Sequence, residues 1–201
     1  MSYLYNKEID LKEKFNHFIS LKVTNENKDY YSSLSIEDFL ELKTTLQDIN
    51  NIITYKTTLN FIKWLKLKFP SISEDIEVCL GQILATKPSD NGFDVVINSD
   101  INIVAEVKCN KPINNGYKFG SAQKNGIKKD IECLLNGKPK VKSIDVTKAL
   151  KFLVIYDFGE YTSKAIEHLI KNLPIEYKQN VEVYSSNDNL ALEKVHIVFI
   201  K

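Results

Sequence analysis

Two acidic residues and a lysine lie in short apolar runs where charged residues are unusual. Asp94 lies in residues 93–97, and Glu106 and Lys108 lie in residues 103–108. Carboxylate oxygens are the ligands that Mg²⁺ prefers, and a nearby lysine can offset negative charge on a phosphate. An unpaired buried charge is costly, so such residues need a partner or a function. The three residues therefore have the chemistry for metal-assisted hydrolysis of a phosphodiester.

These side chains can meet only if the two runs form a hairpin in one register. Both runs are rich in β-branched residues, and a turn-prone asparagine, serine and aspartate separate them. Pairing Ile97 with Ile103 places Asp94 opposite Glu106. Because side chains alternate along a strand, Lys108 then shares their face, whereas a slip of one residue would move Asp94 to the other face.

The same acid-x-lysine spacing occurs elsewhere, so spacing alone does not identify a site. Glu41 and Lys43 repeat it, and Asp29 precedes Glu41 by twelve residues. That segment has a helical pattern, and residues two apart on a helix do not face each other. Glu106 and Lys108 lie instead in a strand-like run that follows another strand-like run with its own acid. This context favours them.

The apolar periodicity predicts an α/β protein with a mixed β-sheet flanked by helices and a helical N-terminal region. We expect residues 1–70 to be helical, within the same domain or as a small subdomain, and residues 71–201 to form the core. The expected helices are 7–20, one opening at the capping-box pattern of Ser35 and Asp38, one ending at Phe69, 71–85, 120–136 and 162–172. The expected strands are 93–97, 103–108, 152–156, 181–184 and 195–200.

Gly92-Phe93-Asp94, eleven further residues and Glu106-Val107-Lys108 resemble the signature of the PD-(D/E)XK nuclease superfamily, the fold of many restriction endonucleases. The resemblance covers roughly residues 71–157 and implies an αβββαβ core. It implies that Asp94 and Glu106 bind Mg²⁺, for which Mn²⁺ can substitute, and that Lys108 positions or activates the attacking water. Phe93 stands where the family often has proline, at a position that varies. The alternative is a chance hairpin with a surface salt bridge between Glu106 and Lys108.

Two further residues are candidates for the same site. Glu77 lies at the edge of the apolar stripe of the helix before the hairpin, where related nucleases often place an additional acidic metal ligand. Gln123 lies on the inward face of the helix after the hairpin, in its first turn. Each has a second interpretation: Glu77 as an ordinary surface glutamate, and Gln123 as a capping residue.

A basic stretch follows the acidic one, as a metal site acting on a polyanion would need, although solvated helix faces and loops give the same pattern. Residues 106–142 contain nine lysines and three acids. The residues we expect to contact DNA are Lys111, Asn114, Asn115, Tyr117 and Lys118 in the connection after the hairpin, and Lys124, Lys128 and Lys129 on the next helix.

The composition, 43% hydrophobic and 26% charged with a net charge of +1, is that of an ordinary globular protein. The start lacks a signal-peptide pattern and there is no long apolar run, so we expect a cytoplasmic protein that does not bind membranes.

Three cysteines without a C-x-x-C pair indicate neither a disulfide framework nor a thiolate zinc site. All 27 basic residues are lysine, so base reading must come from lysine, asparagine, glutamine, serine or threonine.

No P-loop, nucleophile-elbow or zinc-protease motif occurs, so no nucleotide cofactor is expected. The resemblance implies a Mg²⁺-dependent endonuclease of double-stranded DNA, most like a type II restriction endonuclease. A homodimer is expected because one such site cuts one strand, and residues 1–70 would then supply dimerisation or target recognition. The alternatives are a repair or junction-resolving nuclease of the same fold and a non-catalytic DNA-binding protein that retains the fold.

Overall fold

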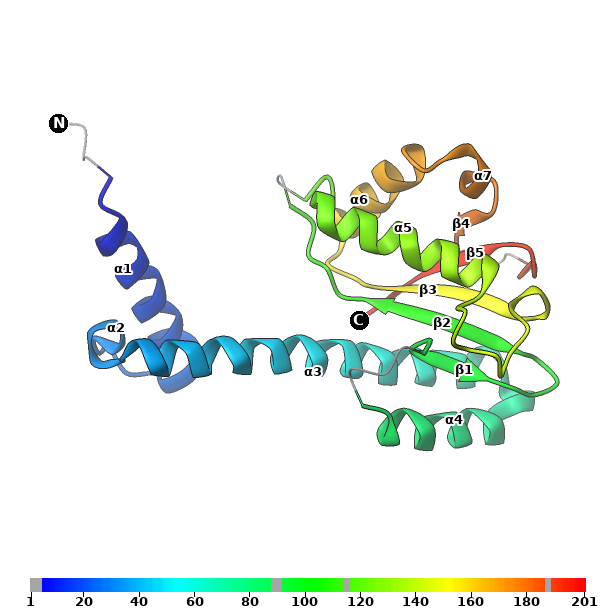
Figure 1. Ribbon diagram of the computed structural model, residues 1–201, viewed down its shortest axis with the longest axis horizontal. Helices are drawn as coiled ribbons and strands as arrows, with labels where there is room; N and C mark the ends of the chain where they lie inside the picture. The colour runs from blue at the N-terminus through cyan, green and yellow to red at the C-terminus, as the bar shows by residue number, and fades with distance from the viewer. Residues whose placement is uncertain (1–4, 88–91, 114–115, 187–188) are drawn as a thin grey trace. The chain divides into compact units, whose positions relative to one another are not determined.

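The computed structural model describes residues 5–87, 92–113, 116–186 and 189–201 (Figure 1). The chain divides into two compact units, Met1–Ile49 and Asn50–Lys201. The boundary lies inside a helix, whereas the sequence analysis placed the end of the helical region at residue 70. The physical reason is that Phe61, Ile62 and Leu65 are buried in the core of the second unit.

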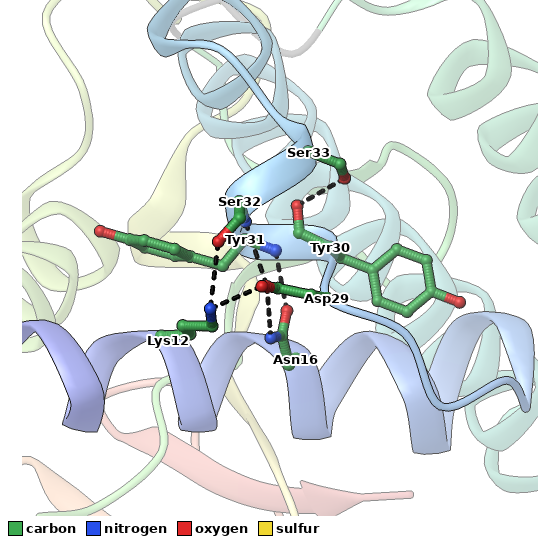
Figure 2. Close-up of polar contacts among 7 residues, drawn as sticks. All are labelled: Lys12, Asn16, Asp29, Tyr30, Tyr31, Ser32 and Ser33. Atoms are coloured by element: carbon green, nitrogen blue, oxygen red, sulfur yellow. Dashed lines mark hydrogen bonds and ion pairs between the residues drawn. The ribbon is translucent and has the colours of Figure 1, made fainter.

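Polar contacts join the helices of the first unit. It comprises α1 (Lys7–Ile19), the π-helical turn η1 (Ser20–Thr24), α2 (Tyr30–Ser33) and the first part of α3 (Ile36–Lys68). Asp29 accepts a hydrogen bond from Asn16 Nδ2 at 2.9 Å and pairs with Lys12 at 2.5 Å (Figure 2). The Tyr31 N–H donates to Asn16 Oδ1 at 2.8 Å. Hydrogen bonds from Lys12 and Asn16 lower the pKa of Asp29.

Helix α3 runs without a break, whereas the sequence analysis expected two helices over this stretch. Its 33 residues include no glycine or proline, the residues that most often interrupt helices. The expected capping box at its start is confirmed. The Ser35 N–H donates to Asp38 Oδ2 at 2.7 Å, and the Asp38 N–H donates to Ser35 Oγ at 3.1 Å.

The second unit contains a five-stranded mixed sheet in the order β1-β2-β3-β5-β4. Its strands are β1 (Val95–Ile97), β2 (Ile103–Lys108), β3 (Leu150–Tyr156), β4 (Val181–Val183) and β5 (Val195–Ile200). Strands β1 and β2 are antiparallel, and the other neighbours are parallel. Ile97 pairs with Ile103 and Val95 with Ala105. The α/β class, the mixed sheet and the hairpin register are therefore confirmed. In the described part of residues 71–157, however, two strands and not three precede the helix Ser121–Asn136, because the connection after β2 forms a single bridge, Ile113 with Lys118, instead of the further strand of an αβββαβ core.

Helices cover both faces of this sheet (Figure 1). One face carries α4 (Ser73–Ala85) and the second half of α3; the other carries α5 (Ser121–Asn136) and α6 (Glu160–Lys171). On β2, Ala105 and Val107 join the core beneath α3 and α4, whereas Val104 joins the core beneath α5 and α6. By alternation, Glu106 and Lys108 lie on the α5 face.

The described part of the second unit also contains the short helices η2 (Pro70–Ile72) and η3 (Val146–Lys148), both 3₁₀, and α7 (Ile175–Lys178). Among the described residues, no helix combines the length and apolar character that a membrane span requires.

Candidate active site

A cleft of about 850 Å³ opens where β1 begins and β2 ends. Its walls come from α3, the β1–β2 pair, α5 and the segment after α5. The residues that line it are Asn50, Ile53, Thr54, Gly92, Asp94, Glu106, Val107, Lys108, Cys109, Asn110, Lys129, Asp130, Cys133, Lys138, Pro139 and Lys140. The three residues singled out from the sequence, Asp94, Glu106 and Lys108, all lie in this cleft.

Asp94 is fixed against the end of β2 by a backbone contact. It lies one residue before β1, so the observed register places it opposite Glu106. Its Oδ2 accepts a hydrogen bond of 2.7 Å from the Val107 N–H, which has no β1 partner because β1 begins only at Val95. The side chain is exposed to the cleft and keeps its second oxygen for other partners.

Glu106 is the most deeply buried acid of the cleft, with a side chain that is 5% exposed. Its Oε1 lies 2.5 Å from Lys138 Nζ. Burial, with the nearby charge of Asp94, raises the pKa of Glu106 to about 7, although Lys138 acts in the opposite direction. Ionisation of this carboxylate is therefore unfavourable near neutral pH, and a divalent cation bound to it would offset that cost.

Lys108 pairs with an acid from the facing helix. Its Nζ lies 2.9 Å from Oδ2 of Asp130 on α5. Burial alone would lower the pKa of Lys108, but Asp130, with Glu106 and Asp94, outweighs burial, so the pKa is raised. Burial raises the pKa of Asp130, and Lys108 only partly offsets this. Lys108 thus stays protonated and is restrained beside the two strand carboxylates.

Asp94 and Glu106 can together hold one divalent cation. Mg²⁺ takes oxygen ligands and is commonly bound through one or two carboxylates, with water and substrate phosphate completing its shell. Across the described part of the chain, no three or more histidine, cysteine, aspartate or glutamate side chains form a group that could hold a metal. The carboxylate oxygens of Asp94 and Glu106 suit Mg²⁺ or Mn²⁺ as ligands, and water and substrate oxygens would have to complete the shell of the ion.

Glu77 does not reach the cleft, so the expectation that it supplies a further metal ligand is corrected. Helix α4 packs on the face opposite to Glu106, through Ile76 and Cys79. The Glu77 side chain is 59% exposed and pairs with Lys66 of α3. Glu77 is therefore an ordinary surface glutamate, which is the alternative to a metal ligand that its sequence position allowed.

Gln123 caps α5 and does not line the cleft. Its Oε1 accepts a hydrogen bond of 3.0 Å from the Gly120 N–H, one of the donors left unpaired where a helix begins. It precedes Asp130 by seven residues, or roughly 10 Å along a helix. The structure thus favours the capping interpretation over a catalytic one.

The residues expected to contact DNA are distributed unevenly around the cleft. Lys129 lines it, whereas Lys124 and Lys128 lie elsewhere on α5. Lys111, Tyr117 and Lys118 are exposed in the connection between β2 and α5, outside the cleft lining. Asn114 and Asn115 lie outside the described residues. DNA contact by these residues remains a prediction.

Two charged residues of the site, Asp130 and Lys138, are not among those expected from the sequence. Asp130 lies next to Ile131 and three residues after Ile127, both in the buried stripe of α5, so an acid beside that stripe was a usable signal. Lys138 follows Gly137, which ends α5 with a φ of 84°, a backbone conformation that favours glycine. No pattern in the sequence indicates that this turn directs Lys138 back to Glu106.

Comparison of the chain with protein-family models, with curated proteins and with solved structures finds no match.

Proposed function

We propose that this protein is a Mg²⁺-dependent endonuclease that hydrolyses phosphodiester bonds of double-stranded DNA. The observation that carries the proposal is the placement of Asp94, just before β1, opposite Glu106 of β2, with Lys108 on the same face, in an open cleft. A chance surface salt bridge does not account for this site. Glu106 is buried, and Lys108 pairs with Asp130 rather than with Glu106.

The proposed chemistry divides between the ion and the residues of this chain. When bound, Mg²⁺ supplies Lewis-acid polarisation of a phosphate oxygen and makes a bound water more acidic. Asp94 and Glu106 hold and orient the ion. Lys108, restrained by Asp130, places a positive charge where negative charge develops on the phosphate and orients the attacking water.

A polyanionic substrate suits the second unit better than the first. Residues 50–201 contain 21 lysines and 17 acids, whereas residues 1–49 contain six lysines and nine acids. Lys129 and Lys140 line the cleft beside the proposed catalytic residues. Phosphate contacts by lysine supply most of the sequence-independent affinity for DNA. We therefore propose that the duplex binds along the cleft of the second unit. The location expected from the sequence, the cytoplasm, is part of the same proposal.

A type II restriction-type enzyme acting as a homodimer is the form of this activity that we favour. One site of this kind cuts one strand, so symmetric cleavage of a duplex needs two copies. Within residues 5–49, none of the described side chains is buried. Leu46 and Ile49, three residues apart on α3, form an exposed apolar stripe, whereas Phe39 of the same helix already packs against Phe15 and Tyr31. A second copy packed on this stripe would bury it.

The test is incubation of the purified protein with unmethylated phage DNA and Mg²⁺, read on a gel beside Asp94→Ala and Glu106→Ala. Discrete bands from the wild type, absent from both variants, are expected. Circular dichroism of the variants controls for folding. Cleavage by either variant would contradict the site. If the wild type cleaves neither phage DNA nor branched or single-stranded DNA, the result would instead favour a non-catalytic DNA-binding protein.

A further inference from the structure

A lysine from outside the hairpin, Lys138, lies against the carboxylate that the proposed function assigns to the metal. Besides its ion pair with Glu106, Lys138 Nζ donates to the carbonyl oxygen of Gly92 at 2.5 Å. The same ammonium lies 4.9 Å from the centre of the Phe93 ring, close enough for a cation–π interaction. Three partners thus hold one ammonium at the floor of the cleft.

This position conflicts with a metal ion on Glu106. A Mg²⁺ ion bonded to Glu106 Oε1 at about 2.1 Å would lie within roughly 4.5 Å of an ammonium that stayed 2.5 Å from the same oxygen. Two cations at that separation beside a buried carboxylate repel each other more strongly than they would in bulk water. The ion and the Lys138 ammonium therefore compete for one carboxylate.

We propose that Lys138 is a built-in counter-ion, which neutralises Glu106 in the metal-free protein and is displaced when the metal binds. The proposal rests on the function proposed above and adds a regulation of the same site. Without metal, Lys138 reduces the cost of an ionised carboxylate that is 5% exposed. The metal must replace this partner, so its affinity for the free protein is weakened.

Displacement leaves Lys138 in the cleft. Gly92 and Phe93 come from the segment just before Asp94, and they retain the ammonium after its contact with Glu106 is lost. The ammonium then has hydrogen-bonding capacity for a phosphate oxygen of the substrate. Because coupling between two ligands is reciprocal, DNA that draws Lys138 away from Glu106 also strengthens metal binding. The metal-free protein thus resists loading until a phosphodiester is present.

The experiment is a calorimetric titration of the full-length protein with Mn²⁺ at pH 8, without DNA. Lys138→Met, which keeps much of the side-chain length and removes the charge, is expected to bind Mn²⁺ about ten-fold more tightly than the wild type. Lys138→Arg keeps the charge and is expected to bind within about two-fold of the wild type. Lys140→Met, at an exposed lysine of the same cleft, is the matched control and is also expected to stay within about two-fold.

Equal or weaker Mn²⁺ binding by Lys138→Met overturns the counter-ion role, as does equal tightening in Lys138→Met and Lys140→Met. Glu106→Gln separates this failure from that of the proposed function. Loss of Mn²⁺ binding in Glu106→Gln, with no gain in Lys138→Met, refutes the counter-ion alone. Binding that is absent in the wild type, or indifferent to Glu106→Gln, refutes both. Thermal melts check folding, and Lys138→Gln replaces Lys138→Met with the same expectation if Lys138→Met does not fold.

Discussion

Both burial and a neighbouring negative charge disfavour the ionised form of Glu106 in the cleft. Its carboxylate is buried, lies near the charge of Asp94, and is relieved mainly by Lys138. A buried carboxylate arranged in this way lowers the stability of the protein, and such arrangements are common at functional sites. The consequence is measurable in the metal-free protein.

Glu106→Gln is expected to raise the melting temperature at pH 8 and to have little effect at pH 5. The folded pKa of about 7 lies above the ordinary value of 4.5, so the folded state binds the proton more tightly. The free energy of unfolding therefore falls as pH rises from about 4.5 through 7, and the full penalty is present at pH 8. Removing the charge should regain on the order of 2 kcal/mol there.

Thermal melts in a chelator at the two pH values check this. Glu167→Gln, at an exposed glutamate of α6, is the control and should leave the melting temperature unchanged at both. A Glu106→Gln variant that is destabilised at pH 8 would show that the ionised carboxylate helps to hold the fold.

Asp130 is a positioning residue that acts through Lys108. Asp130→Asn removes the charge that most opposes the effect of burial on Lys108, so the pKa of Lys108 should fall. If cleavage needs protonated Lys108, the rate should drop about ten-fold and its alkaline limb should move to lower pH.

Cleavage rates measured between pH 7 and 10 test this, with Asp130→Glu expected to restore most of the rate. An unchanged alkaline limb in Asp130→Asn would separate Asp130 from the ionisation of Lys108.

At the scale of elements, α5 performs two separate tasks. Its first turn is stabilised by the cap from Gln123, and its second half faces the cleft with Lys129, Asp130 and Cys133. The β1–β2 hairpin supplies the other wall. One helix thus contributes stability at one end and charge placement at the other, and the two can be separated by mutation.

Gln123→Ala is expected to lower the free energy of unfolding by about 1 kcal/mol, through loss of the cap at Gly120. Urea denaturation measures this. Cleavage at a temperature well below the transition should be unchanged, because Gln123 does not line the cleft. A ten-fold loss of cleavage in a folded Gln123→Ala protein would return this residue to the catalytic set.

At the scale of the whole molecule, the two units differ in how they bury apolar surface. The second unit has a core on each face of its sheet, whereas the described residues of 5–49 include no buried side chain. Apolar side chains that stay exposed over a whole helical segment are typical of association surfaces. The first unit is also acidic, so a protein surface suits it better than a polyanion.

Leu46→Lys is expected to convert the proposed dimer to a monomer, because it places a charge in the apolar stripe of α3. Light scattering after size exclusion measures the mass. Thr44→Lys, on the other side of the same helix, is the control and should leave the dimer intact. A wild-type protein that is monomeric at micromolar concentration would contradict the homodimer.

Local pattern was sufficient to predict most of the fold and the placement of three of the five charged residues of the candidate site. The strands, the hairpin register and the shared face of Asp94, Glu106 and Lys108 follow from alternation along adjacent strands, which the order of residues dictates. The expectation of two helices between Ser35 and Phe69 was wrong, because no glycine or proline interrupts the segment and α3 continues through it.

Only the tertiary structure decided which helix lies over which face of the sheet. Periodicity shows that a helix has an apolar side, but not which layer buries it. Glu77 therefore lay opposite the site, and Gln123 lay at the wrong end of its helix. Asp130 and Lys138 reach Lys108 and Glu106 across gaps of more than twenty residues in sequence, through packing and a glycine turn. The order of residues thus determined the acids and the lysine of the hairpin, whereas long-range packing determined the charges that surround them.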